Sequence, residues 1–125
     1  MLSVNDIHKL CIKNFVYTPD TEQYNLREHW TSHEDAVMQD MIWRDDCDGF
    51  AITAAVIALN EGYNPTDIIL AFVLTETNTG HLVCCVDNKM IDNRQRSAIA
   101  AYMPHYKWIK GMNLKDKIWK TFSED

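Results

Sequence analysis

The segment from Phe50 to Leu59 constrains the fold more than any other part of the sequence. Its residues are apolar almost all the way round a helical period, so we expect a helix that is buried on most of its sides. Gly62 suits the left-handed conformation that ends many helices, and Pro65 follows just beyond it. A chain of 125 residues can build one core around such a helix, so we expect a single domain over residues 1–125.

The start of this helix carries the strongest chemical signal in the chain, because Asp45, Asp46 and Asp48 surround Cys47 there. Aspartate oxygens accept the unpaired backbone N–H groups of a helix start, so Asp46 and Asp48 are interpreted first as helix caps. The positive end of the helix dipole favours the thiolate form of a cysteine in the first turn. Because the thiolate is the nucleophile, we expect Cys47 to be catalytic. The alternative is a buried structural cysteine.

The remaining elements follow from hydrophobic spacing. Residues 68–74, 81–86 and 90–92 are predicted strands joined by short turns, which indicates an antiparallel sheet against the central helix. Helices are predicted at about 4–15, 32–43, 94–103 and 114–122, and a further strand at about 106–109. A capping box at Thr31–Glu34 marks the expected start of the second helix. The expected fold class is therefore α+β.

Composition narrows the range of functions. The net charge is −6, with 12 basic and 18 acidic residues, which disfavours a nucleic-acid partner. Four cysteines fit no disulfide framework. The N-terminus lacks the pattern of a secretory signal, and no apolar run approaches the ~20 residues of a membrane span, so no membrane partner is expected. We expect a cytoplasmic protein with reduced thiols.

His81 and Asp92 are the candidates for a base that would serve Cys47. His81 follows Gly80 at the start of a predicted strand, and Asp92 lies on the next strand across a tight hairpin centred near Asn88. The hairpin brings both side chains to the same end of neighbouring strands. Cysteine, histidine and aspartate then have the roles of nucleophile, base and orienting group. The alternatives are an exposed histidine at a strand end and an aspartate in a turn.

These residues carry a resemblance to a known family. Trp30, Asp46-Cys47-Asp48 with Ala51, Gly62, Gly80-His81 and Asp92-Asn93 resemble the bacterial transglutaminase-like cysteine peptidases. The best-known members of that family are periplasmic proteases that cut a biofilm adhesin. The resemblance implies a papain-like transglutaminase core and a catalytic triad of Cys47, His81 and Asp92. A short form without an export signal points to a cytosolic protein, possible in a phage as well as in a bacterium.

The chain departs from the family pattern at two positions beside the nucleophile. The family motif reads Gly-Asp-Cys-Glu-Asp-Tyr-Ala, whereas this chain has Asp45 in place of the glycine and Gly49 in place of the second acidic residue. Acidic residues of that motif help to bind calcium in the family. Only Asp46 and Asp48 match, and two aspartates alone supply too few of the six to eight oxygens that Ca²⁺ takes. Calcium is therefore an optional ligand in this interpretation.

Two tryptophans and one histidine pair complete the candidate residues. Trp30 and Trp43 are interpreted as core residues, or as indole donors to an oxyanion hole alongside the Cys47 backbone amide. His29 and His33 have the spacing of a zinc pair, but they lie at a helix start and lack an H-E-x-x-H pattern, which argues against zinc.

The function expected from these residues is hydrolysis of a peptide bond in a protein or peptide substrate. The reaction would pass through a thioester on Cys47 and would require no cofactor. Two alternatives stay open. The same thioester serves a transglutaminase-like acyl transferase or a glutamine deamidase, and an inactive binding module could keep the same fold.

Overall fold

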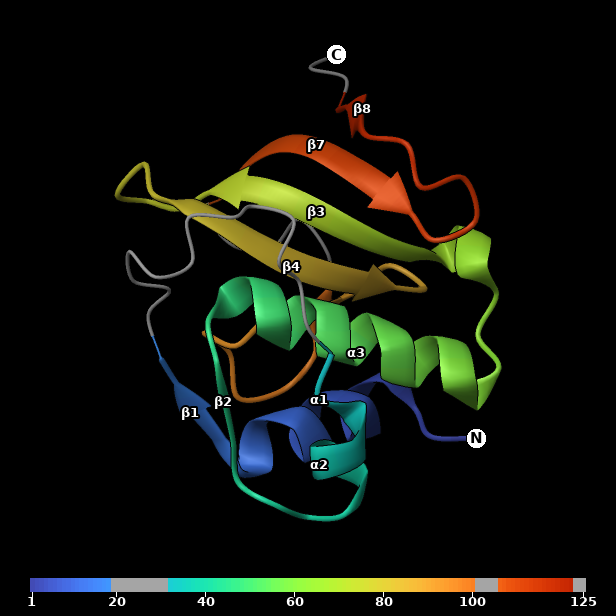
Figure 1. Cartoon of the computed structure of the whole chain (residues 1–125). Coiled ribbons are helices and arrows are strands. Elements are labelled where there is room, and N and C mark those ends of the chain that lie inside the picture. Colours follow the sequence, from blue (N-terminus) through green and yellow to red (C-terminus); the bar gives the residue numbers. More distant parts are fainter. Residues whose placement is uncertain (19–31, 101–105, 123–125) are drawn as a thin grey trace.

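The computed structural model of the chain describes residues 1–18, 32–100 and 106–122 (Figure 1). The helical elements are α1 (Val4–Lys13), α2 (Glu34–Met38), α3 (Cys47–Glu61) and the short 3₁₀ element η2 (Pro65–Asp67). The strands are β1 (Phe15–Tyr17), β2 (Trp43–Asp45), β3 (Ile68–Leu74), β4 (Gly80–Val86), β5 (Lys89–Ile91), β6 (Ile99–Ala100), β7 (Lys107–Asn113) and β8 (Lys120–Thr121). This mixture of helix and sheet confirms the α+β fold class.

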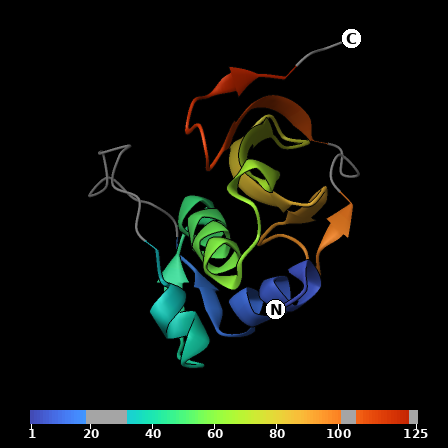
Figure 2. The ribbon, with the colours of Figure 1, turned by 90° about the vertical axis from the view of Figure 1, so that its right-hand side faces the viewer.

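Helix α3 forms the centre of the molecule, as its apolar sequence predicted. The side chain of Asp46 caps its first turn by accepting a hydrogen bond from the Gly49 backbone N–H at 3.1 Å. Gly62 ends it with a φ of 105°, a left-handed conformation that glycine adopts without steric cost. The helix lies between the sheet and α1, and the view turned by 90° shows the same layers (Figures 1 and 2).

Among the described residues, the main sheet has six strands in the order β6-β5-β4-β3-β7-β8, and every neighbouring pair is antiparallel. The β4–β5 hairpin turns at Asp87 and Asn88, which both have positive φ and so match the twist of the strands. Its register pairs Cys84 with Ile91, whereas a hairpin centred on Asn88 would pair Cys84 with Asp92, so the observed register differs by one residue. The hairpin still leaves His81 and Asp92 at the same end of the two strands.

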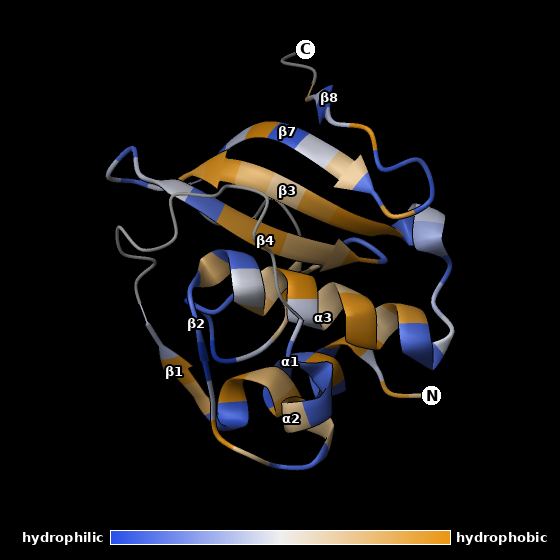
Figure 3. Ribbon diagram, in the orientation of Figure 1, coloured by the Kyte–Doolittle hydropathy of each residue, from blue (hydrophilic) through white to orange (hydrophobic). Residues whose placement is uncertain are grey.

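The core fills the space between α3, α1 and the facing side of β3 and β4. Figure 3 shows apolar residues along α3 and along these central strands, with polar residues on the connecting loops. Phe50 is 1% exposed and stacks on Trp43, with ring centroids 5.8 Å apart. The Phe15 ring contacts the Phe50 ring edge-on, with ring centroids 4.8 Å apart. The short parallel pair β1–β2 carries Phe15 and Trp43 to this position. In the described ranges, no helix combines the length and apolar character that crossing a membrane requires.

The prediction of a helix at 32–43 is mostly wrong. Only Glu34–Met38 is helical, its first turn has no side-chain cap, and Thr31 lies outside the described residues. Met41 is 54% exposed, whereas Trp43 belongs to strand β2 and is 3% exposed. The chain leaves the helix early because strand pairing with β1 places the Trp43 indole in the core.

The predictions of helices at about 94–103 and 114–122 are also wrong. Ile99–Ala100 is strand β6, and residues 101–103 lie outside the described ranges. In the segment 114–122, the Asn113 side chain accepts hydrogen bonds from the backbone N–H groups of Lys115 and Asp116, at 3.0 and 2.7 Å. This local turn competes with helix formation despite the helical spacing of the apolar residues.

Phe50 offers a test of this core. We expect Phe50→Ala to lower the free energy of unfolding by about 3–5 kcal/mol, because it removes a buried aromatic ring from α3 and leaves a cavity. Leu59→Ala on the same helix is the matched control, since Leu59 is 43% exposed and its truncation should cost far less. Denaturant unfolding of both variants measures the difference, and equal losses would contradict the assignment of the core.

Candidate active site

Cys47 is the first residue of α3, directly after the capping Asp46. It is partly exposed, whereas the other three cysteines, Cys11, Cys84 and Cys85, are buried. The start of α3 meets strand β4, and the Leu82 backbone makes a hydrogen bond to the Cys47 sulfur. Leu82 follows His81 on the same strand. The fold therefore places the candidate nucleophile against the backbone of the residue next to the candidate base.

The surroundings of Cys47 favour the neutral thiol. Its Sγ lies 3.6 Å from Asp48 Oδ1, to which the thiol donates. Burial, together with the carboxylates of Asp48 and Asp46, raises the pKa of Cys47 to about 12, and the hydrogen bond from the Leu82 backbone offsets this rise only in part. The prediction of a thiolate stabilised by the helix start is corrected accordingly. Burial and two nearby negative charges outweigh the helix dipole.

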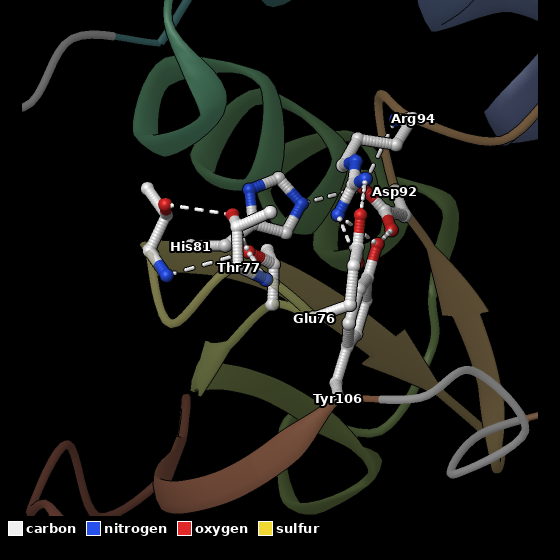
Figure 4. Close-up of polar contacts among 8 residues, drawn as sticks. Glu76, Thr77, His81, Asp92, Arg94 and Tyr106 are labelled. Atoms are coloured by element: carbon white, nitrogen blue, oxygen red, sulfur yellow. Dashed lines mark hydrogen bonds and ion pairs between the residues drawn. The ribbon is translucent and has the colours of Figure 1, made fainter.

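His81 and Asp92 form a buried pair (Figure 4). His81 Nε2 lies 2.7 Å from Asp92 Oδ1, and the two side chains are 6% and 0% exposed. Burial alone would raise the pKa of Asp92, but hydrogen bonds from His81, the Arg94 backbone and Tyr106, together with the charge of His81, lower it overall. The ionised carboxylate can only accept, so the imidazole carries its proton on Nε2. His81 Nδ1 is then the nitrogen that can take a proton from a nucleophile.

Cys47 and His81 share no hydrogen bond among the described residues. The thiol instead donates its hydrogen bond to Asp48. Catalytic hydrogen bonds often tighten only when substrate binds. The assignment of Cys47, His81 and Asp92 as a triad stays a prediction, to which the structure adds the His81–Asp92 contact and the position of Leu82.

Three further residues hold Asp92, and sequence reasoning missed all of them. Tyr106 donates its hydroxyl to Asp92 Oδ2 at 2.5 Å, and the Arg94 backbone N–H donates to Oδ1 at 3.0 Å. His8 Nε2 contacts the main chain of the same residue, with a hydrogen bond of 2.9 Å to the Asp92 carbonyl oxygen. His8 lies 84 residues away from Asp92 in the sequence. No local pattern in the sequence connects such distant residues.

The turn before Cys47 explains both departures from the family motif. Asp45 Oδ1 accepts from the Asp46 backbone N–H at 2.7 Å, and its Oδ2 lies 2.9 Å from His33 Nε2. A Cβ atom added at Gly49 would lie 1.9 Å from the Asp45 Cγ. The Asp45 carboxylate thus occupies the space that a side chain at position 49 would need. In this structure, the Asp45 carboxylate and a side chain at position 49 therefore exclude each other.

The structure tests the oxyanion-hole interpretation for Trp43 but not for Trp30. The Trp43 indole N–H donates to the Cys11 carbonyl oxygen at 3.0 Å, deep in the core. This bond uses the only donor of the indole, so the interpretation of Trp43 as an oxyanion donor is wrong. Trp30 and His29 lie outside the described residues.

The acidic residues at the nucleophile do not fit a calcium site as they stand. Asp46 Oδ1 caps α3, Asp48 Oδ1 accepts from the thiol, and both Asp45 oxygens are engaged. In the part of the chain that the structure describes, no group of three or more His, Cys, Asp or Glu side chains is arranged to hold a metal ion. Calcium takes six to eight oxygen ligands, which these carboxylates do not provide together.

Comparisons with known proteins identify the family and the fold of the chain. A family model described as bacterial transglutaminase-like cysteine proteinase, BTLCP, matches residues 1–125. The fold is similar to Legionella pneumophila LapG in an EGTA-treated form (TM-score 0.67, 17% identity, 88% of this chain and 61% of that one). A calcium-bound form of LapG gives a TM-score of 0.65 at 18% identity, covering 86% of this chain and 63% of the other. The chain thus spans about three fifths of these structures. No curated protein sequence matches it.

Thiol labelling tests the electrostatics of the site. Iodoacetamide should modify Cys47 before the three buried cysteines, and its rate should rise about tenfold per pH unit between about pH 6 and pH 9, because the thiolate fraction grows with pH below a raised pKa. Peptide mapping of the modified protein gives the rate at each cysteine.

Asp48→Asn is the matched variant for this measurement. It removes a carboxylate that raises the pKa of the thiol, so labelling of Cys47 should become faster at every pH in this range. A labelling rate for the unchanged protein that is already constant below pH 7 would show a stabilised thiolate and contradict this description.

Proposed function

The chain belongs to the bacterial transglutaminase-like cysteine proteinase family, and from this membership we propose that it hydrolyses a peptide bond in a protein substrate. The observation that carries the proposal is the buried His81–Asp92 hydrogen bond on the strand that contacts Cys47. A base held by a carboxylate, on the strand whose next residue contacts a partly exposed cysteine, supplies the groups that thiol catalysis needs.

In the proposed reaction, the Cys47 sulfur attacks the carbonyl carbon while His81 Nδ1 takes the thiol proton. A C–S bond forms and the carbonyl electrons move to the oxygen. Collapse of this tetrahedral intermediate breaks the C–N bond, and His81 gives its proton to the leaving amine. The acyl group remains on Cys47 as a thioester. Water then attacks with His81 as base, releasing the acid and restoring the thiol.

The raised pKa of Cys47 fits a general-base mechanism in which the proton moves as the substrate is attacked. The ionised Asp92 stabilises the imidazolium that forms at that moment, as the aspartate does in serine protease triads. The Cys47 backbone N–H lies at the N-terminus of α3, where helical N–H groups have no partner within the helix. This group is the candidate donor to the developing oxyanion.

A second candidate is a non-catalytic binding module on the same fold. The observation in its favour is that the thiol donates to Asp48 and shares no hydrogen bond with His81 among the described residues. Transfer of the acyl group to an amine, or deamidation of glutamine, would use the same thioester and differ only in the group that attacks it.

Substitution of the proposed catalytic residues separates these functions. Cys47→Ala and His81→Gln should each lower peptide cleavage by about 10³-fold or more, because each removes a group that makes or breaks bonds. The assay is incubation with a proteome-derived peptide library, with new N-termini read by mass spectrometry. Melting temperatures near that of the unchanged protein serve as the control for folding. Absence of cleavage by the folded, unchanged protein would favour the binding module.

We further propose that the turn at Asp45 and Asp46, directly before Cys47, is stable without bound calcium. Both oxygens of the Asp45 carboxylate are engaged, by His33 and by the Asp46 backbone, at the place where a residue 49 side chain would lie. Saturating a calcium site 100-fold above its dissociation constant would add about 2.7 kcal/mol, a rise in melting temperature on the order of 10 °C. We expect no such shift between calcium and EGTA.

The double variant D45G/G49D is the control for the calcium experiment. It frees the space beside α3 and returns the acidic side chain to position 49, so it should gain a melting temperature that depends on calcium. The single variant Gly49→Asp should be destabilised, because its Cβ would overlap the Asp45 carboxylate. A large rise in the melting temperature of the unchanged protein with calcium would refute the proposal.

A further inference from the structure

The Asp92 carboxylate is held at both of its oxygens, and the two sides differ. Oδ1 receives two donors, His81 Nε2 at 2.7 Å and the Arg94 backbone N–H at 3.0 Å. Oδ2 receives the Tyr106 hydroxyl at 2.5 Å. Figure 4 shows the phenol of Tyr106 reaching Asp92 from the side away from the Arg94 backbone.

The main chain at Asp92 is anchored separately. His8 is fully buried in α1, and its Nε2 lies 2.9 Å from the Asp92 carbonyl oxygen. That acceptor requires a proton on Nε2, and burial lowers the pKa of His8, so the ring is the neutral donor. This hydrogen bond restrains the main chain at Asp92 independently of the contacts to its carboxylate.

Tyr106 is itself held in place. The Arg94 guanidinium lies 5.6 Å from the centre of the phenol ring and contacts the hydroxyl at 3.4 Å. Arg94 is fixed in turn by two hydrogen bonds to the Glu76 carboxylate, at 2.7 and 3.3 Å. The phenol also contacts the His81 ring edge-on, with centroids 5.7 Å apart. Burial raises the pKa of Tyr106, which keeps its hydroxyl a donor.

We propose that Tyr106 is a positioning residue that fixes the rotation of the Asp92 carboxylate and, through it, the tautomer of His81. Oδ1 has two donors and acts as a pivot, whereas Oδ2 is restrained by the phenol. Without that hydroxyl, Oδ2 would be a buried carboxylate oxygen lacking its donor, a state that costs free energy and that rotation or water entry would relieve. The carboxylate would then hold His81 Nε2–H less firmly. This inference rests on the proposed function.

The position of Tyr106 gives the proposal a consequence for catalysis. A firm Nε2–H···Oδ1 bond leaves Nδ1 unprotonated and available to Cys47, whereas a loosened bond lets the proton occupy either ring nitrogen. The fraction of protein with a competent base then falls, which lowers kcat without changing contacts to the substrate. Tyr106 touches neither Cys47 nor substrate in this scheme, so its effect passes through Asp92.

Nitrogen NMR of the His81 ring tests the proposal directly. In the unchanged protein, at a pH where the His81 ring is neutral, the ¹⁵N shifts should show one tautomer with the proton on Nε2. Tyr106→Phe removes a single oxygen atom and should shift both nitrogens toward a mixture of tautomers. For a single peptide that the unchanged protein cleaves, kcat of the variant should fall by about 10- to 100-fold with KM nearly unchanged. Tyr63→Phe is the matched control, because the Tyr63 hydroxyl donates to the Leu2 carbonyl instead and should leave both readouts unaltered.

A second variant keeps the test decisive if Tyr106→Phe folds poorly. Arg94→Met removes the guanidinium that orients the phenol but keeps the backbone N–H that bonds to Asp92, and it should shift the His81 nitrogens in the same direction. A single Nε2–H tautomer in both variants would overturn the positioning role. The NMR result stands apart from the proposed function, since a protein without peptidase activity would still report the His81 tautomer.

Discussion

The buried hydrogen bond between His81 and Asp92 is the interaction on which the proposed chemistry depends. A carboxylate with no solvent exposure is tolerated only when donors satisfy its oxygens. Here the donors come from β4, from the segment after β5 and from the residue before β7. The main chain of Asp92 is tied to α1 through His8. The site is therefore assembled by the whole fold, because no single element supplies more than one or two of these contacts.

Opposing effects act on the pKa of Cys47, and burial is the largest of them. The N-terminus of α3 favours a thiolate by up to about 2 kcal/mol in favourable geometry. Loss of hydration and the carboxylates of Asp46 and Asp48 act in the opposite direction and prevail. A neutral thiol can act as the nucleophile only if its proton moves during the attack, and His81 is the proposed acceptor of that proton. The reactivity of this cysteine is thus expected to depend on substrate binding more than on its resting state.

Local signals made part of this structure predictable. The cap at Asp46, the left-handed end at Gly62 and the strand Ile68–Leu74 follow from short stretches of sequence. The His81–Asp92 contact was approached through the hairpin register, with an error of one residue. The shortened α2 and the Asn113 turn departed from periodicity because pairing and side-chain hydrogen bonds overrode it. Partners distant in sequence, such as His8 and Tyr106, left no pattern to recognise.

In the proposed reaction, Cys47 forms a thioester with the acyl part of a cleaved peptide. The most direct measurement is acid quenching of the protein during turnover of the peptide library, followed by peptide mapping with and without hydroxylamine. We expect an acyl adduct on the peptide that contains Cys47, which hydroxylamine removes and which is absent from His81→Gln. Cleavage that proceeds without any adduct at Cys47, or an adduct on another cysteine, would contradict it.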